Sequence, residues 1–164
     1  NLALAARRGK RRTLRWGIKK VEREDYRELL RTLDLGLEDR LSAKAGLLSG
    51  GQRQALTLLM AALVQPKLLL LDEHTAALDP KTAAKVLELS EQIVTENHLT
   101  TLMVTHNMRD AINLGNRLIM MSEGRVVLDI RGAEKKRLTV EDLLERFTAA
   151  SGKEFSNDRV LLGA

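Results

Sequence analysis

The sequence predicts an α/β domain built on a parallel sheet. Residues 68–71 are four consecutive leucines, and residues 100–105 are β-branched and apolar, so both stretches are predicted strands. Four leucines alone would also fit a helix. Between these stretches, residues 80–96 carry apolar side chains at helical spacing and open with Pro80. Strand, helix and strand in this order indicate a crossover connection, and we expect the leucine strand to be buried on both faces.

Composition limits the class of protein. With 164 residues, 44% hydrophobic and 30% charged, the chain can bury a substantial core as a globular domain does. It contains no cysteine, which excludes a disulfide framework and a thiolate metal site. Its net charge of +5 permits an acidic partner without requiring one. No apolar run approaches the roughly 20 residues that cross a bilayer.

The remaining elements follow from periodicity and turn residues. We expect helices over residues 23–33, 53–65 and 108–114, with Gly36 and Gly115 as C-terminal caps. Residues 118–121 and 125–130 form a predicted hairpin around Gly124. After residue 131 we expect a charged, mobile tail apart from a helix over 139–149 that Thr139 caps. The chain starts at Asn1, within an amphipathic stretch, and we expect a preceding portion.

Leu48, Ser49, Gly50, Gly51 and Gln52 precede the second of these helices. Ser49 is a natural N-cap, and two glycines let the backbone approach a bound group closely. The first helical turn also offers unpaired N–H groups and the positive end of the helix dipole, so this stretch suits an anion. Taken alone, it is equally an ordinary capped helix after a glycine turn.

Chemistry-bearing residues end both predicted strands. Asp72 and Glu73 follow the leucine run, and His106 follows the second strand. Open α/β sheets bind ligands at the carboxyl ends of their strands, so these side chains belong to a candidate site. Adjacent carboxylates on a strand point in different directions, which lets one serve a metal and the other a water molecule. Asp79, before Pro80, is a further candidate, with a helix cap as the alternative.

Together these residues resemble the ABC ATPases. Residues 48–52, 68–73, 77–79 and 105–106 are similar, in order and spacing, to that family's signature motif, Walker B strand, D-loop and switch histidine. The resemblance implies part of a P-loop NTPase (RecA-like) sheet with an α-helical signature subdomain. It divides the chain into a helical subdomain over 1–63, the later part of the ATP-binding core over 64–130, and a C-terminal tail over 131–164.

The resemblance also implies roles for the site residues. ATP and Mg²⁺ are the expected ligands, with Asp72 holding the metal ion. Glu73 acts as general base on the attacking water and His106 contacts the γ-phosphate. Ser49, Gly50, Gly51 and Gln52 close over the nucleotide of a second ATPase subunit, and Asp79 links the two subunits.

No Walker A motif, Gly-x-x-x-x-Gly-Lys-Ser/Thr, is present in the 164 residues. We therefore expect these residues alone to bind ATP weakly and not to hydrolyse it. Ala77 also stands where the family often has serine.

The leading interpretation is an ABC transporter ATPase subunit, cytoplasmic and peripheral on the inner face of the membrane, working with a second ATPase subunit and a transmembrane permease. The basic stretch 7–20 would face that partner, although a solvated loop fits its composition as well. An alternative is a soluble ABC ATPase that acts on nucleic acid or ribosomes, although nucleic acid is not an expected partner. A third reading, an inactive interaction module, is disfavoured because Glu73 and His106 are both present.

Overall fold

The computed structural model describes residues 1–10 and 18–151. The middle of the basic stretch, 11–17, lies outside these residues. The chain forms two compact units, residues 1–103 and 104–164. The three-part division predicted from the motifs remains a proposal.

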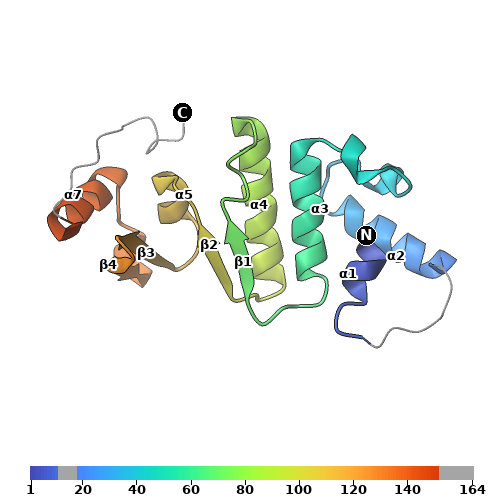
Figure 1. The fold of residues 1–164 in the computed structure, drawn as a ribbon, viewed down its shortest axis with the longest axis horizontal. Helices are drawn as coiled ribbons and strands as arrows, with labels where there is room; N and C mark the ends of the chain where they lie inside the picture. The colour runs from blue at the N-terminus through green and yellow to red at the C-terminus, as the bar shows by residue number, and fades with distance from the viewer. Residues whose placement is uncertain (11–17, 152–164) are drawn as a thin grey trace. The chain divides into compact units, whose positions relative to one another are not determined.

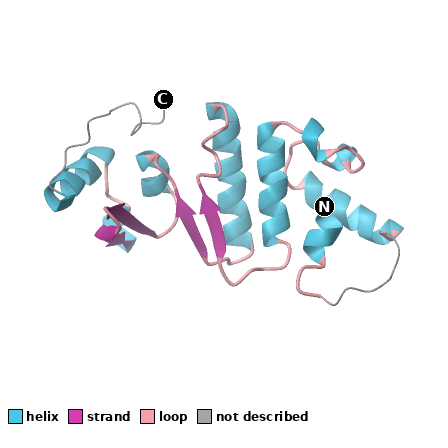
Figure 2. Ribbon diagram, in the orientation of Figure 1, coloured by secondary structure: helices cyan, strands magenta, loops and turns pink. Residues whose placement is uncertain are grey.

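The first unit contains the predicted parallel pair of strands. β1 (Leu69–Asp72) lies beside β2 (Thr101–Val104), whose last residue begins the second unit. The Leu69 amide donates to the Thr100 carbonyl over 2.9 Å, which brings the starts of both strands together. Both arrows point the same way in Figure 2. The strands are joined through α4 (Pro80–Glu96), which has the bounds that the sequence predicted.

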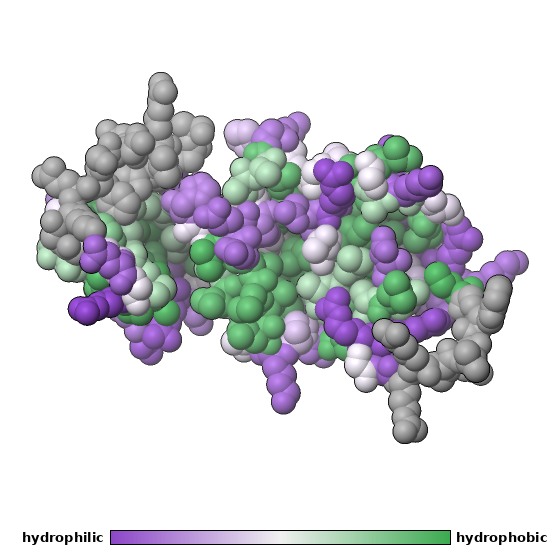
Figure 3. Space-filling model, viewed as in Figure 1, coloured by the Kyte–Doolittle hydropathy of each residue, from purple (hydrophilic) through white to green (hydrophobic). Residues whose placement is uncertain are grey.

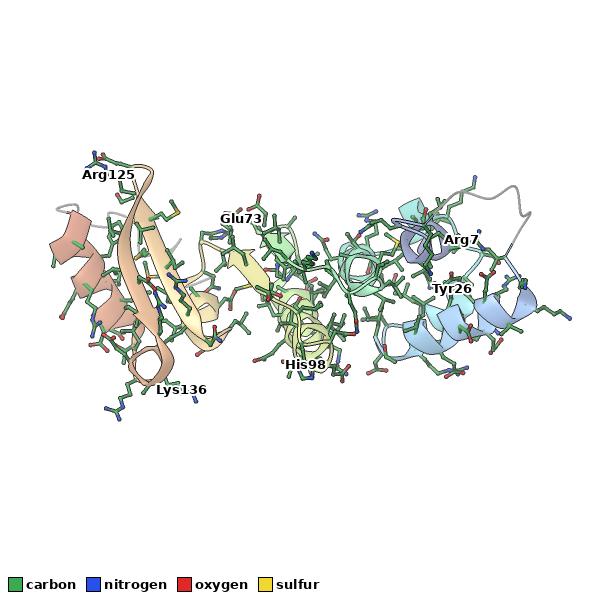
Figure 4. The ribbon with its side chains drawn as sticks, turned by 90° about the horizontal axis from the view of Figure 1, so that it is seen from below. Arg7, Tyr26, Glu73, His98, Arg125 and Lys136 are labelled. Atoms are coloured by element: carbon green, nitrogen blue, oxygen red, sulfur yellow. The ribbon has the colours of Figure 1, made fainter. Side chains whose placement is uncertain are left out.

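Helices complete the first unit (Figure 1). They are α1 (Leu2–Ala6), α2 (Lys20–Arg31) and α3 (Gly50–Ala62), with short 3-10 turns η1 (Glu38–Arg40) and η2 (Ala45–Leu47) between α2 and α3. The helix predicted at 23–33 begins earlier, at Lys20, and its predicted apolar face is confirmed by the burial of Tyr26 and Leu30. Arg7, the C-cap of α1 (labelled in Figure 4), pairs with Glu22 of α2 at 3.2 Å, so part of the basic stretch is engaged within the unit.

The β1–β2 sheet has one buried and one exposed face among the described residues. Leu69 and Leu71 enter the core with Leu89 and Ile93 of α4. Leu70 is 64% exposed and Leu102 51% exposed, and Figure 3 shows hydrophobic surface over these strands. The expectation that the leucine strand is buried on both faces is therefore wrong for this chain, because α4 covers one face and the other lacks a covering layer in the described part.

The second unit is organised around the predicted hairpin. β3 (Arg117–Ser122) pairs antiparallel with β4 (Arg125–Arg131), and Leu118 opposite Ile130 supplies the buried face. α5 (Met108–Asn113) and α7 (Val140–Ser151) contribute Met108 and Leu143 to the same core. The predicted cap of α7 is confirmed, since the Asp142 amide donates to Thr139 Oγ1 over 3.1 Å.

Residues 132–151 are more ordered than the sequence predicted, and the rest of the predicted tail, 152–164, lies outside the described residues. The described part contains α6 (Gly132–Lys135), and Lys135 is buried. The Lys135 ammonium donates to the carbonyls of Ile112 and Leu114, two of the unpaired acceptors at the end of α5. Expecting a mobile tail here was wrong because charged composition does not show that one lysine caps a helix distant in sequence. Within residues 1–10 and 18–151, no helix is long and apolar enough to cross a bilayer.

Candidate nucleotide site

The signature stretch forms the start of α3, and Ser49 is its N-cap as predicted. Ser49 Oγ accepts from the Gln52 amide over 3.2 Å, and Gln52 Oε1 accepts from the Ser49 amide over 3.0 Å. Nε2 of the same Gln52 side chain donates to the Leu35 carbonyl over 3.0 Å. This reciprocal capping box fixes the entry of the chain into the helix and orients the amides of its first turn toward the N-terminal end.

The two glycines have a packing role that the sequence did not reveal. A Cβ on Gly51 would lie 2.1 Å from Thr82 Cγ2, and one on Gly50 would lie 3.0 Å from Leu78 Cδ2. Thr82 is in the first turn of α4, and Leu78 is in the loop before it. The start of α3 therefore approaches the start of α4 more closely than any side chain at Gly51 allows.

The two carboxylates lie where β1 gives way to the loop before α4 (Figure 4 labels Glu73). Asp72 is the exposed last residue of the strand, and Glu73 is exposed after it. Glu73 has φ +41°, in the left-handed region that residues other than glycine seldom adopt. Its carbonyl accepts from the Ala76 amide over 3.0 Å, which closes a turn. The backbone therefore turns sharply at Glu73, directly after the strand that ends with Asp72.

Asp79 is the N-cap of α4. Its Oδ1 accepts from the Thr82 amide over 3.0 Å, and hydrogen bonds with Thr82 hold the pKa of the Asp79 carboxyl below its ordinary value. Pro80 occupies the first helical position, where a missing N–H has no cost. The capping alternative considered for Asp79 is therefore present in the structure, and a role between subunits would be additional to it.

His74, the residue after Glu73, bonds to α4. Its Nε2 lies 2.9 Å from Ser90 Oγ. The signal that could have indicated a partner is Ser90 itself, a polar residue on the buried face that α4 forms with Val86, Leu89 and Ile93. A buried hydroxyl on an apolar helix face needs hydrogen-bond partners.

His106 belongs to the second unit, between β2 and α5. Its side chain is exposed. On its C-terminal side, Asn107 caps α5 by accepting from the Arg109 amide over 2.9 Å, and the Asn107 amide donates to Thr105 Oγ1 over 3.1 Å. The backbone on both sides of His106 is thereby fixed. Its contact with the γ-phosphate remains a prediction of the motif.

The acidic and histidine side chains show what kind of Mg²⁺ site this chain could form. In the part of the chain that the structure describes, no three His, Asp or Glu side chains gather to hold a metal ion. This fits Mg²⁺ bound through one or two carboxylates together with nucleotide phosphates and water, and Asp72, exposed at the end of a strand, suits that arrangement. A metal held by protein side chains alone does not fit these residues.

A parallel strand pair with a crossover helix, carboxylates at a strand end and a capped glycine helix fit part of a P-loop NTPase of the cassette type. Comparison with known proteins supports this class. The family model described as ABC transporter matches residues 5–76. The tyrosine transport ATP-binding protein of Clostridioides difficile (strain R20291) is 50% identical over 92% of this chain and 59% of its own length.

Two further relatives agree. An aliphatic sulfonates import ATP-binding protein of Paraburkholderia xenovorans (strain LB400) is 41% identical over 69% of this chain and 33% of its own length. The dimeric structure of a bacterial ABC transporter cassette superposes with a TM-score of 0.55 at 31% identity, over 71% of this chain and 50% of that one. The chain is therefore similar over most of its length to ATP-binding proteins of ABC transporters, and residues 5–76 match the family model. It spans about three fifths or less of the length of these relatives.

Proposed function

We propose that these residues are part of an ATPase subunit that binds and hydrolyses ATP to drive transport of a solute across a membrane. The observation that carries the proposal is the pair Asp72 and Glu73 at the carboxyl end of a parallel strand, in a chain 50% identical to a transport ATP-binding protein. Members of the family bind nucleotide, and cassettes of this kind have been seen as dimers and with ADP and phosphate.

In the proposed reaction, Glu73 takes a proton from the attacking water, and His106 orients that water against the γ-phosphate. Asp72 holds Mg²⁺, which neutralises charge on the phosphates when bound. The N-terminal amides of α3 and the Ser49 hydroxyl face the γ-phosphate of a nucleotide held by a second subunit. Asp79 contributes to the contact between subunits. None of these 164 residues forms a Walker A motif to cradle the phosphates.

The transport reading is favoured over an ATPase that acts on nucleic acid. The relatives reported above are named for transport or import, with tyrosine and aliphatic sulfonates as their solutes. We propose a small organic solute taken up by the cell, with tyrosine as the first candidate because that relative has the higher identity. The membrane partner is a permease subunit, which places the protein on the cytoplasmic side of the membrane.

Uptake measurements test this function. Deleting the gene should lower uptake of labelled tyrosine, and the wild-type gene should restore it. The tagged protein should also co-purify with a multispanning membrane protein. Unchanged uptake would reject tyrosine as the solute. Salt-dependent binding to RNA, without any membrane partner, would favour the nucleic-acid alternative instead.

A further inference from the structure

The turn that carries Glu73 is held in a costly conformation. Glu73 has φ +41°, a left-handed geometry that for a residue with a Cβ persists only where the surroundings impose it. One restraint is local, the hydrogen bond from the Ala76 amide to the Glu73 carbonyl. A contact between this turn, at the end of a four-residue strand, and a neighbouring helix would add a non-local restraint.

His74 provides a contact of that kind. Ser90 is 4% exposed, and its Oγ lies 2.7 Å from the Val86 carbonyl, to which it donates its single hydroxyl proton. With that proton committed, Ser90 Oγ accepts from His74 Nε2 over 2.9 Å, so Nε2 of the ring carries a proton. The residue next to Glu73 is therefore bonded to the buried face of α4.

The same helix also sets the position of Asp79. Asp79 caps the first turn of α4, and Ser90 lies further along it. A hydrogen bond from His74 to Ser90 thus connects the loop containing Glu73 to the helix that Asp79 begins. Rigid support of this kind is what a catalytic carboxylate requires, since a displacement of about 1 Å can cost up to a hundredfold in rate.

We propose that His74 is a positioning residue that holds Glu73 in place through its hydrogen bond to Ser90. This rests on the proposed ATPase function. The ring acts as a donor toward α4 and takes no proton from the attacking water. Its contribution is to keep the Glu73 carboxylate oriented toward the water that it activates.

The test uses the full-length protein assembled with its membrane partner. H74A should lower kcat for ATP hydrolysis by about tenfold or more while KM for ATP and the melting temperature stay near the wild-type values. H74Q should recover most of the rate, because the glutamine Nε2 can donate from a similar position. S90A should resemble H74A, and the double variant should be no slower than either single one.

The matched control is H98N. His98 is an exposed histidine with φ +51° after the end of α4, and asparagine tolerates that geometry, so its rate should equal wild type. Nitrogen NMR of the histidine rings should show a proton on His74 Nε2. A proton on Nδ1 alone would overturn the proposal, as would an H74A protein as active as wild type, or one whose KM and melting temperature change with kcat and that H74Q does not restore. If the wild-type protein hydrolyses no ATP, the proposed function is wrong, and the positioning role of His74 is wrong with it. If the wild-type protein is active, the rates of the His74 and Ser90 variants test the positioning role alone.

Discussion

Residue 51 lies so close to α4 that only glycine, which has no Cβ, fits there without a steric clash. The nearest atom to a Cβ at this position is Thr82 Cγ2, at 2.1 Å. Sequence reasoning placed Gly51 at a phosphate, because a glycine pair before a helix admits a ligand to the backbone. Nothing in the sequence showed that the same glycine also lets α4 pack closely, because residues 51 and 82 are 31 positions apart in the chain.

We predict that G51A destabilises the first unit by about 1–3 kcal/mol, because the added methyl group overpacks the contact between α3 and α4. Urea unfolding followed by circular dichroism measures this loss. T82S removes the clashing Cγ2, so G51A/T82S should regain most of the stability. G46A is the control, since nothing lies within 4 Å of a Cβ there. A G51A midpoint equal to wild type would show that the helices separate at no cost.

At the scale of elements, boundaries set by local chemistry were predictable. Asp79 with Pro80 marks the start of α4, and Ser49 the start of α3, because capping depends on neighbours in sequence. α6 was missed because the burial of Lys135 depends on carbonyls of α5, over twenty residues earlier. Left-handed geometry at Glu73 was also invisible, since glutamate carries no signal for it.

The hairpin of the second unit makes a pH prediction at this scale. Arg117 donates two hydrogen bonds to Asp129, at 2.8 and 2.7 Å, and Arg131 adds another at 2.9 Å. The hydrogen bonds from Arg117, which have the largest effect, and from Arg131 hold the pKa of the Asp129 carboxyl far below its ordinary value. Because the folded pKa is the lower one, this stabilisation is present above the unfolded pKa of about 3.9 and is lost as pH falls through the folded pKa.

Wild-type protein should therefore lose stability below about pH 4 more steeply than D129N does, and the difference should shrink in high salt because the pair is exposed. Thermal melts at a series of pH values measure it. E145Q, at an exposed acid of α7, should follow the wild-type curve. Parallel curves for D129N and wild type would mean that the arginines do not stabilise the folded carboxylate.

At the scale of the whole molecule, the fold class and the order of the site motifs were predictable, and the environment of the sheet was not. A run of leucines predicts burial on both faces, yet Leu70 is 64% exposed in this chain. Burial depends on which segments cover a strand, and the chain spans 59% of the tyrosine transport relative. The assignment of ATP chemistry depends likewise on the family motifs, which supply the proposed roles of Glu73 and His106.

The central claim is that Glu73 is the general base of an ATPase, and E73Q tests it most directly. In the full-length protein with its membrane partner, this change keeps the size and polarity of the side chain and removes its ability to accept the proton of water. Steady-state release of phosphate should fall at least about a hundredfold while nucleotide binding, measured separately, is retained. An E73Q protein that hydrolyses ATP at the wild-type rate would contradict the account.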